Sequence, residues 1–182
     1  MGLLLKNSKK VNEGVIEYVD VLIEGEFIKK IAASISSSNH KIIDLKGALL
    51  LPGVIDDQVH FREPGLTHKG TIKSESVAAV AGGITSFMEM PNTQPPALTQ
   101  ELLRDKFNIA RKKSPANFSF FMGASNDNIK EVLKTDFSKV PGVKIFMGAS
   151  TGHMLVDNSQ TLNNIFSSVE GLIAVHCEDE DI

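Results

Sequence analysis

The sequence predicts an α/β fold built on a parallel β-sheet and preceded by a small β-rich module. Strand-like apolar runs alternate with helical patterns at intervals of roughly thirty residues, the rhythm of βαβ units. The first fifty residues differ, because they contain short β-rich runs and a hairpin signal at Glu24-Gly25-Glu26 but no helical pattern. We therefore expect a small β module over residues 1–50 and an α/β part over residues 51–182.

The elements of the α/β part follow from apolar spacing and from capping residues. The run 72–83 is helical in pattern and ends in a glycine pair suited to a helix C-cap. Thr99 is a good N-cap for a helix over 100–113, which carries an apolar stripe. Residues 127–134 and 158–169 are shorter helical candidates. The expected strands are 53–61, 83–90, 116–124, 142–149 and 171–177.

The positions of the polar residues favour a closed (β/α) barrel over an open sheet. No glycine-rich phosphate loop follows the first expected strand, as it often does in an open doubly wound sheet. Barrels place their chemistry at the C-terminal ends of the strands. A TIM-type (β/α)₈ barrel needs about 250 residues and eight strands, so only about five of its β/α units fit here. Polar residues at or after the strand ends are His60, Arg62, Asn92, Lys144 and His176.

Composition excludes several classes of function. The chain has 182 residues, 42% apolar and 23% charged, and a net charge of −3, which gives no basic footprint for nucleic acid. Cys177 is the single cysteine, which rules out an internal disulfide and suits a reducing compartment. No apolar run approaches membrane-spanning length, and the N-terminus lacks a signal-peptide core. We expect a soluble cytoplasmic protein with neither nucleic-acid nor membrane partners.

Two histidines at strand ends suggest a metal site. His60 ends the first expected strand and His176 ends the fifth, so a parallel sheet would bring both to the same edge. In an alternating strand Gln58 shares the face of His60, so the sequence has Gln-x-His where His-x-His would make a two-histidine metal clamp. The alternative for each histidine alone is a hydrogen-bonded pocket residue.

Lys144 lies inside an apolar strand, where a charge is costly unless it has a partner. If the side chain points outward, it is an ordinary solvated lysine. If it points inward, burial lowers its pKa and exposes a nucleophilic amine. Such an amine can take up carbon dioxide, and the resulting carbamate is an anionic ligand that can bridge two metal ions.

Arg62 and Asn92 are candidates for substrate binding. A guanidinium group binds a carboxylate through two parallel hydrogen bonds, and the amide of Asn92 follows the next strand. The alternatives are a surface ion pair of Arg62 with Glu63 and a turn role for Asn92.

Three stretches together resemble dihydroorotase, a cyclic amidohydrolase of the amidohydrolase superfamily. They read PGVIDDQVHFREPG from Pro52, GGITSFMEMPNTQPP from Gly82 and AVHCEDE from Ala174. The resemblance runs from residue 48 to the C-terminus. It implies a (β/α)₈ barrel with a small β-sandwich built from both chain ends. It also implies reversible ring closure of N-carbamoyl-L-aspartate to L-dihydroorotate, a small-molecule substrate pair of de novo pyrimidine biosynthesis.

The resemblance also implies roles for single residues and a zinc cofactor, with one or two ions per complete chain. Asp56 matches the aspartate that opens the first motif, and Lys144 resembles a lysine that some dihydroorotases, hydantoinases and allantoinases carboxylate. Other dihydroorotases use an aspartate at that place. The remaining matches are His60 and His176 as metal ligands, and Arg62 and Asn92 as the pair that holds the substrate carboxylate.

Two departures from the family pattern keep alternatives open. Gln58 replaces the first metal histidine, and a further histidine ligand and the general acid/base aspartate are expected beyond residue 182. The chain is therefore interpreted as a partial form that is inactive alone. One alternative is an allantoinase- or hydantoinase-type enzyme. Another is a non-catalytic dihydroorotase-like subunit that associates with a carbamoyltransferase. A homo-oligomer is also expected.

Overall fold

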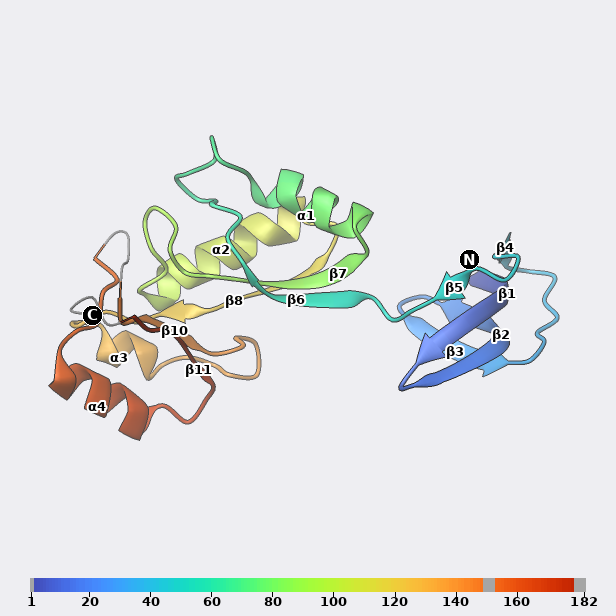
Figure 1. Cartoon of the computed structure of the whole chain (residues 1–182). Helices are drawn as coiled ribbons and strands as arrows, with labels where there is room; N and C mark the ends of the chain where they lie inside the picture. Colours follow the sequence, from blue (N-terminus) through green and yellow to red (C-terminus); the bar gives the residue numbers. More distant parts are fainter. Residues whose placement is uncertain (1, 149–152, 179–182) are drawn as a thin grey trace. The chain divides into compact units, whose positions relative to one another are not determined.

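A computed structural model describes residues 2–148 and 153–178 of the chain (Figure 1). The chain folds into two compact units, Met1–Pro52 and Gly53–Ile182. Each unit has its own sheet or sheets, and each is described by itself below. No helix in the described part of the chain is long and apolar enough to cross a membrane.

The first unit is a sheet of five strands within the described residues, in the order β3-β2-β1-β4, with β5 also paired to β1. Two hairpins join β1 to β2 and β2 to β3, and the second one turns at the predicted Glu24-Gly25-Glu26 signal. The last two strands run parallel to β1. Their bounds are β1 Leu3–Asn12, β2 Val15–Glu24, β3 Phe27–Ala32, β4 Lys41–Asp44 and β5 Leu49–Leu50.

A buried carboxylate organises the bulge in β1. The pairing with β2 shifts between Leu5 and Ser8, and Asn7 there has a positive φ of 55°. Asp20 accepts hydrogen bonds from the backbone amides of Asn7 and Ile35, both at 2.9 Å. These bonds, chiefly the one from Asn7, lower the pKa of Asp20. The carboxylate therefore holds the bulge of β1 and the loop after β3 together.

The second unit contains parallel strands that follow one another in chain order. β6 pairs with β7 and β7 with β8, while β9 pairs with β10 and β10 with β11. Only Phe121 separates β8 from β9, so one extended segment pairs with β7 and then with β10. The bounds are β6 Val54–Val59, β7 Ile84–Glu89, β8 Asn117–Phe120, β9 Met122–Gly123, β10 Val143–Phe146 and β11 Ile173–His176.

Five parallel segments are thus present in the predicted places, and the strand order never reverses. An open doubly wound sheet would reverse its order at a switch point. Within the described residues β6 and β11 do not pair with each other, so the sheet is not closed by these strands. Residue 149, the last of the expected strand 142–149, lies outside the described residues.

Thr99 caps α2 as predicted, because its side chain accepts a hydrogen bond from the backbone amide of Leu102. The structure adds a second threonine cap, Thr71, which accepts from the backbone amide of Ser74 at the start of α1. The predicted helix over 127–134 is shorter in the structure, and Asn128 does not cap it, because its Oδ1 accepts from the backbone amide of Ser125 while its Nδ2 donates to the carbonyls of Leu98 and Gly123. The bounds are α1 Ile72–Ala81, α2 Gln100–Lys113, α3 Ile129–Val132 and α4 Ser159–Ser168.

The core of this unit lies between the strands and the helices. Figure 1 shows α1 and α2 along the β6–β8 strands and α3 and α4 along β10 and β11. The ring of Phe107 on α2 packs edge-on against Phe120 of β8, with centroids 5.0 Å apart, and Phe87 of β7 joins the same cluster. This packing fixes α2 on β7 and β8, and so fixes the loop between β7 and α2.

Candidate active site

Four of the five residues expected at strand ends lie at or after the C-terminal ends of parallel strands, whereas Lys144 lies inside its strand. His60 and Arg62 follow β6, Asn92 follows β7, and His176 is the last residue of β11. Lys144 is the second residue of β10. Because the strands are parallel, their C-terminal ends lie at one edge of the sheet, which is where α/β barrels carry their active sites.

His60 and Asn92 are in direct contact. The imidazole Nδ1 lies 2.8 Å from the amide Oδ1 of Asn92, so Nδ1 carries the proton and donates it. The second ring nitrogen, Nε2, is left with its lone pair. Burial lowers the pKa of His60, and the positive charges of Arg62 and Lys144 lower it further. The ring is therefore neutral at neutral pH, which is the form that binds a metal ion.

The two loops that carry these residues pack against each other. The backbone amide of Gln94 donates to the carbonyl of Pro64 at 3.1 Å. Gly65 has a φ of 83°, and a Cβ at this position would lie 1.9 Å from the carbonyl oxygen of Gln94. Only glycine allows this approach. The HFREPG and MPNTQPP stretches therefore form one structural unit, which explains why both belong to the same motif.

Lys144 points inward, which is the second of the two orientations considered from the sequence. It is 3% exposed, and its Nζ lies 5.1 Å from the ring centroid of Phe146. Burial lowers the pKa of its amine. Among the described residues the amine has no hydrogen-bond or ion-pair partner. Its neighbours in the strand register are Gly123 of β9 and Ala174 of β11.

His176 lies on the same face of the sheet as Lys144 but is more open to solvent. It pairs with Phe146 in the β10–β11 register, two residues after the Lys144–Ala174 pair, so the two pairs share a face. Its side chain is 45% exposed, and its Nε2 lies 2.9 Å from Oε1 of Glu178. In this structure the ring therefore bonds a neighbouring carboxylate rather than a residue of another strand.

Gln58 is exposed, and the strand around it is irregular. The pairing of β6 with β7 shifts between Asp56 and Val59, so one extra residue is present in β6. The backbone amide of Gln58 donates to Oδ1 of Asp56 at 3.2 Å. Strict alternation would place Gln58 and His60 on one face, but this bulge interrupts the alternation. Before the bulge, Asp56 is paired in the strand register with the core residue Phe87.

The donor types fit a zinc site in part. Within residues 2–148 and 153–178 no three His, Cys, Asp or Glu side chains lie close enough to hold a metal ion. The neutral imidazole of His60 with a free Nε2 is a suitable zinc ligand. The buried amine of Lys144 suits a metal only after it has lost its proton or been carboxylated. The donor atoms of His60 and Lys144 are therefore of types that can bind zinc.

Comparison with known proteins decides the family. A family model described as "Dihydro-orotase-like" matches residues 47–182. The chain belongs to this dihydroorotase-like family. It is 34% identical to the dihydroorotase of Methanosphaera stadtmanae over 100% of this chain and 41% of that protein. It is also 34% identical to the dihydroorotase of Bacillus cytotoxicus over 100% of this chain and 43% of the relative.

Solved structures of related enzymes share the fold. The L-hydantoinase (dihydropyrimidinase) from Arthrobacter aurescens superposes with a TM-score of 0.92 at 30% identity, covering 99% of this chain and 41% of its own. The D-hydantoinase from a Thermus species gives a TM-score of 0.77 at 26% identity, over 98% of this chain and 41% of its own. The dihydroorotase-like chain thus spans about two fifths of the length of the relatives it matches.

Sequence reasoning missed one buried ion pair of this dihydroorotase-like chain. Nζ of Lys106, on α2, lies 3.0 Å from Oε2 of Glu89, the last residue of β7. A signal was present, because Lys106 interrupts the apolar stripe of α2, three residues after Leu103 and four before Ala110. A charged residue in the middle of such a stripe needs a buried partner.

Proposed function

We propose that a full-length protein containing this chain interconverts N-carbamoyl-L-aspartate and L-dihydroorotate, the dihydroorotase step of de novo pyrimidine biosynthesis. The single observation that carries the proposal is the pairing of His60 with Asn92 at 2.8 Å, with Arg62 two residues along, inside a chain of this family. A neutral imidazole suits a metal ion, and an amide and a guanidinium suit a carboxylate, so these three residues support the proposal.

The proposed architecture is a TIM-type (β/α)₈ barrel of which residues 51–182 form the N-terminal part, with residues 1–50 as part of a β-sandwich. The parallel strands in unbroken chain order support it, as does the similarity to hydantoinase structures. The remaining β/α units would lie outside these 182 residues. The general acid/base aspartate would also come from that part.

Substrate recognition is assigned to Arg62 and Asn92. The guanidinium of Arg62 would hold the substrate carboxylate through two parallel hydrogen bonds. Asn92 would use its amide nitrogen for the substrate, because its Oδ1 already accepts the Nδ1 proton of His60. Asn92 would then orient both the imidazole and the substrate. Such an arrangement fixes the position of the reacting carbonyl relative to His60.

Zinc, one or two ions per complete chain, would be held by His60, His176 and Lys144, with Gln58 as a weak additional ligand. When bound, zinc lowers the pKa of a water molecule and polarises the amide carbonyl. The amine of Lys144, whose pKa is lowered by burial, would take up carbon dioxide and release one proton to become a carbamate. His60 keeps its own proton on Nδ1, so Nε2 stays available as a ligand.

A hydantoinase- or allantoinase-type activity is the second candidate. The similarity to the L-hydantoinase structure favours it, because the TM-score is 0.92. Arg62 with Asn92 argues for the first candidate, since dihydroorotate carries a carboxylate that hydantoins lack. A third candidate is a non-catalytic subunit that associates with a carbamoyltransferase, and Gln58 is the feature that favours it.

The test is a substrate panel with purified full-length protein and added zinc. Turnover of dihydroorotate and carbamoyl-aspartate would support the proposal, whereas turnover of only 5-substituted hydantoins or allantoin would establish the second candidate. Protein that binds no zinc and turns over none of these substrates would support the non-catalytic subunit. Sedimentation of the same sample would test the proposed homo-oligomer, and cell fractionation the proposed cytoplasmic location.

A further inference from the structure

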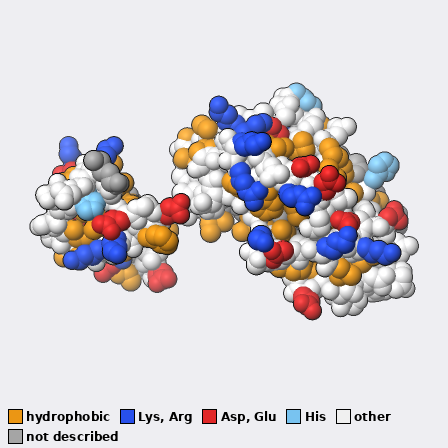
Figure 2. Space-filling model, turned by 180° about the vertical axis from the view of Figure 1, so that it is seen from behind, with side chains coloured by type: hydrophobic (Ala, Val, Ile, Leu, Met, Phe, Trp, Pro, Cys, Tyr) orange, Lys and Arg blue, Asp and Glu red, His pale blue; other side chains and the backbone are white. Residues whose placement is uncertain are grey.

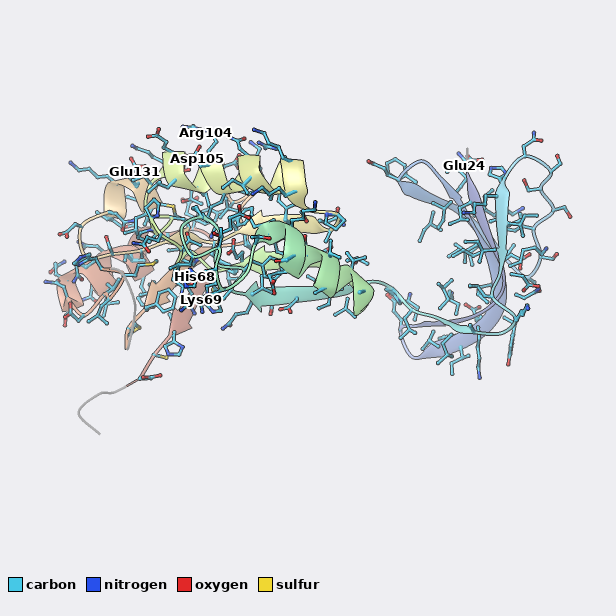
Figure 3. The ribbon with its side chains drawn as sticks, turned by 90° about the horizontal axis from the view of Figure 1, so that it is seen from above. Glu24, His68, Lys69, Arg104, Asp105 and Glu131 are labelled. Atoms are coloured by element: carbon cyan, nitrogen blue, oxygen red, sulfur yellow. The ribbon has the colours of Figure 1, made fainter. Side chains whose placement is uncertain are left out.

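The ion pair between Glu89 and Lys106 is completely enclosed by protein. The two residues are 0% and 1% exposed. Besides its contact with Glu89, the ammonium of Lys106 donates to the backbone carbonyl of Met90 at 2.9 Å. Its neighbours Arg104 and Asp105 point away from the strands at the outer surface of α2 (Figure 3). Lys106 is thus the polar residue of α2 that faces the sheet.

Stability does not explain such a pair well. Burial raises the pKa of Glu89 and lowers that of Lys106, which reflects the cost of removing both charges from water. Apolar residues of similar volume often replace a buried ion pair without loss of stability. Within the described residues, neither oxygen of Glu89 receives a hydrogen bond of regular geometry, although Lys106 lies 3.0 Å away. The pair is therefore not explained by a saturated polar network.

The position of the pair connects it to both substrate loops. Met90, whose carbonyl Lys106 holds, begins the loop that carries Asn92. On the other side, Glu89 is paired with Val59, the last residue of β6, and the amide of Met90 donates to the Val59 carbonyl at 2.9 Å, so the pair lies beside the start of the loop that carries Arg62. Arg62 has a φ of 67°, a left-handed conformation that a non-glycine residue keeps only when its surroundings hold it.

We propose that the Glu89–Lys106 pair is a positioning device for the substrate site. Lys106 holds the start of the loop after β7, and Glu89 is paired with Val59 at the end of β6, where the loop that carries Arg62 begins. Together they set the relative position of Asn92 and Arg62, which must meet the same substrate carboxylate. The inference rests on the proposed function of these two residues. Neither member of the pair is assigned a catalytic role, because both side chains are enclosed by protein.

The first experiment separates positioning from stability in the full-length protein. Lys106→Met leaves the Glu89 carboxyl buried without a partner, so the thermal midpoint falls. The double variant Lys106→Met with Glu89→Met fills the same space with apolar groups and recovers much of the midpoint. Both variants are expected to lose about 100-fold in kcat/KM for dihydroorotate, mainly through KM, because the loops are misplaced. The control Lys112→Met, on the exposed side of α2, keeps both properties.

The second experiment does not depend on turnover. The side-chain amide of Asn92 is observed by NMR in full-length protein without substrate, together with hydrogen exchange of the Arg62 backbone amide. In the double variant the Asn92 signal shifts and the Arg62 amide exchanges faster. Glu89→Gln, which keeps the shape and removes the charge, gives a smaller change in the same direction and serves if the double variant fails to fold.

A double variant with wild-type KM and kcat, or with unchanged Asn92 and Arg62 signals, would overturn the positioning role. If the wild-type protein turns over no dihydroorotate, the proposed function fails at that point. The NMR measurement then still decides whether the pair positions the two loops.

Discussion

At the scale of single residues, Gln58 is where this chain departs most clearly from the dihydroorotase motif. It stands at the position of a metal histidine, on the exposed side of a bulged strand, with its backbone amide bonded to Asp56. An amide oxygen is a neutral ligand and binds zinc more weakly than imidazole does. His60, two residues along, keeps a free Nε2. The proposed metal site is thus predicted to differ from the family pattern at one ligand.

Gln58→His should raise the zinc content of the full-length protein, because imidazole is the stronger ligand at this position. The measurement is the metal content after dialysis, compared between wild type and variant. Gln58→Leu, which supplies no ligand, is the matched control and should bind no more zinc than the wild type. Equal zinc content in wild type and Gln58→His would mean that position 58 does not contribute to zinc binding or that Gln58 already acts as a zinc ligand.

At the scale of elements, the contact between the loops after β6 and β7 depends on Gly65. Its positive φ excludes most side chains, and any Cβ added there would lie only 1.9 Å from the Gln94 carbonyl oxygen. The Gln94 amide also donates to the Pro64 carbonyl across the same contact. The relative position of Arg62 and Asn92 therefore depends on this glycine as well as on the buried ion pair.

Gly65→Ala should separate the two loops and raise KM for dihydroorotate, with a loss of at least about 1 kcal/mol in stability from the left-handed backbone alone. Gly83→Ala is the control, because Gly83 also has a positive φ of 92° but open space around its Cβ position. The control should lose stability and keep its KM. Equal KM changes in the two variants would contradict the role of the loop contact.

The bulge of β1 allows a second prediction for an element. Asp20 accepts two backbone hydrogen bonds and lies 3.0 Å from Nζ of Lys6, and its pKa is lowered, chiefly by the bond from Asn7. Asp20→Asn should cost about 2 kcal/mol, the usual worth of hydrogen bonds to a charged group. Glu17→Gln, in an exposed pair with Lys10, should change stability by less than about 0.5 kcal/mol.

The pH dependence of this contribution has a definite sign. A lowered carboxyl pKa means that the unfolded chain binds the proton more readily. The contribution of Asp20 is therefore complete above its ordinary pKa of 3.8 and is lost as the pH falls through the lower folded value. Hydrogen exchange of the Asn7 and Ile35 amides should accelerate in that window. Exchange that is equally pH-dependent in Asp20→Asn would contradict this assignment.

At the scale of the whole molecule, the second unit carries apolar strand residues that the described part leaves exposed. Val54 and Ile55 of β6 and Val175 of β11 are 56%, 60% and 41% exposed. On the face seen in Figure 2, basic and acidic side chains are interspersed with hydrophobic ones, and no extended patch of one charge is visible there. Exposed apolar residues on the outermost strands β6 and β11 favour association through these edges.

A polypeptide of residues 1–182 alone should self-associate and hold less than one zinc ion per chain. The edges of β6 and β11 are unpaired on one side within the described strands, and the expected further ligands are absent from these residues. Sedimentation velocity and metal analysis measure both properties, with the full-length protein as control. A monodisperse 182-residue monomer with two bound zinc ions would contradict the proposed architecture.

Much of the fold was predictable from local pattern. The βαβ rhythm, the glycine pair after α1 and the N-cap Thr99 are short-range signals, and each corresponds to an element of the structure. The bulge in β6 and the shortened α3 were not predictable, because both depend on contacts with distant segments. The roles of His60, His176 and Lys144 as ligands stay predictions.

The sequence by itself determined the family, the strand order and the identity of the polar residues near the strand ends, because motifs and periodicity are properties of short continuous stretches of sequence. Only the tertiary structure decided that Lys144 is buried, that His60 bonds Asn92, and that Glu89 and Lys106 meet inside the protein. The physical reason is that burial and pairing depend on residues brought together by the packing of α2 on β7 and β8. A single stretch of sequence contains only one partner of each such contact.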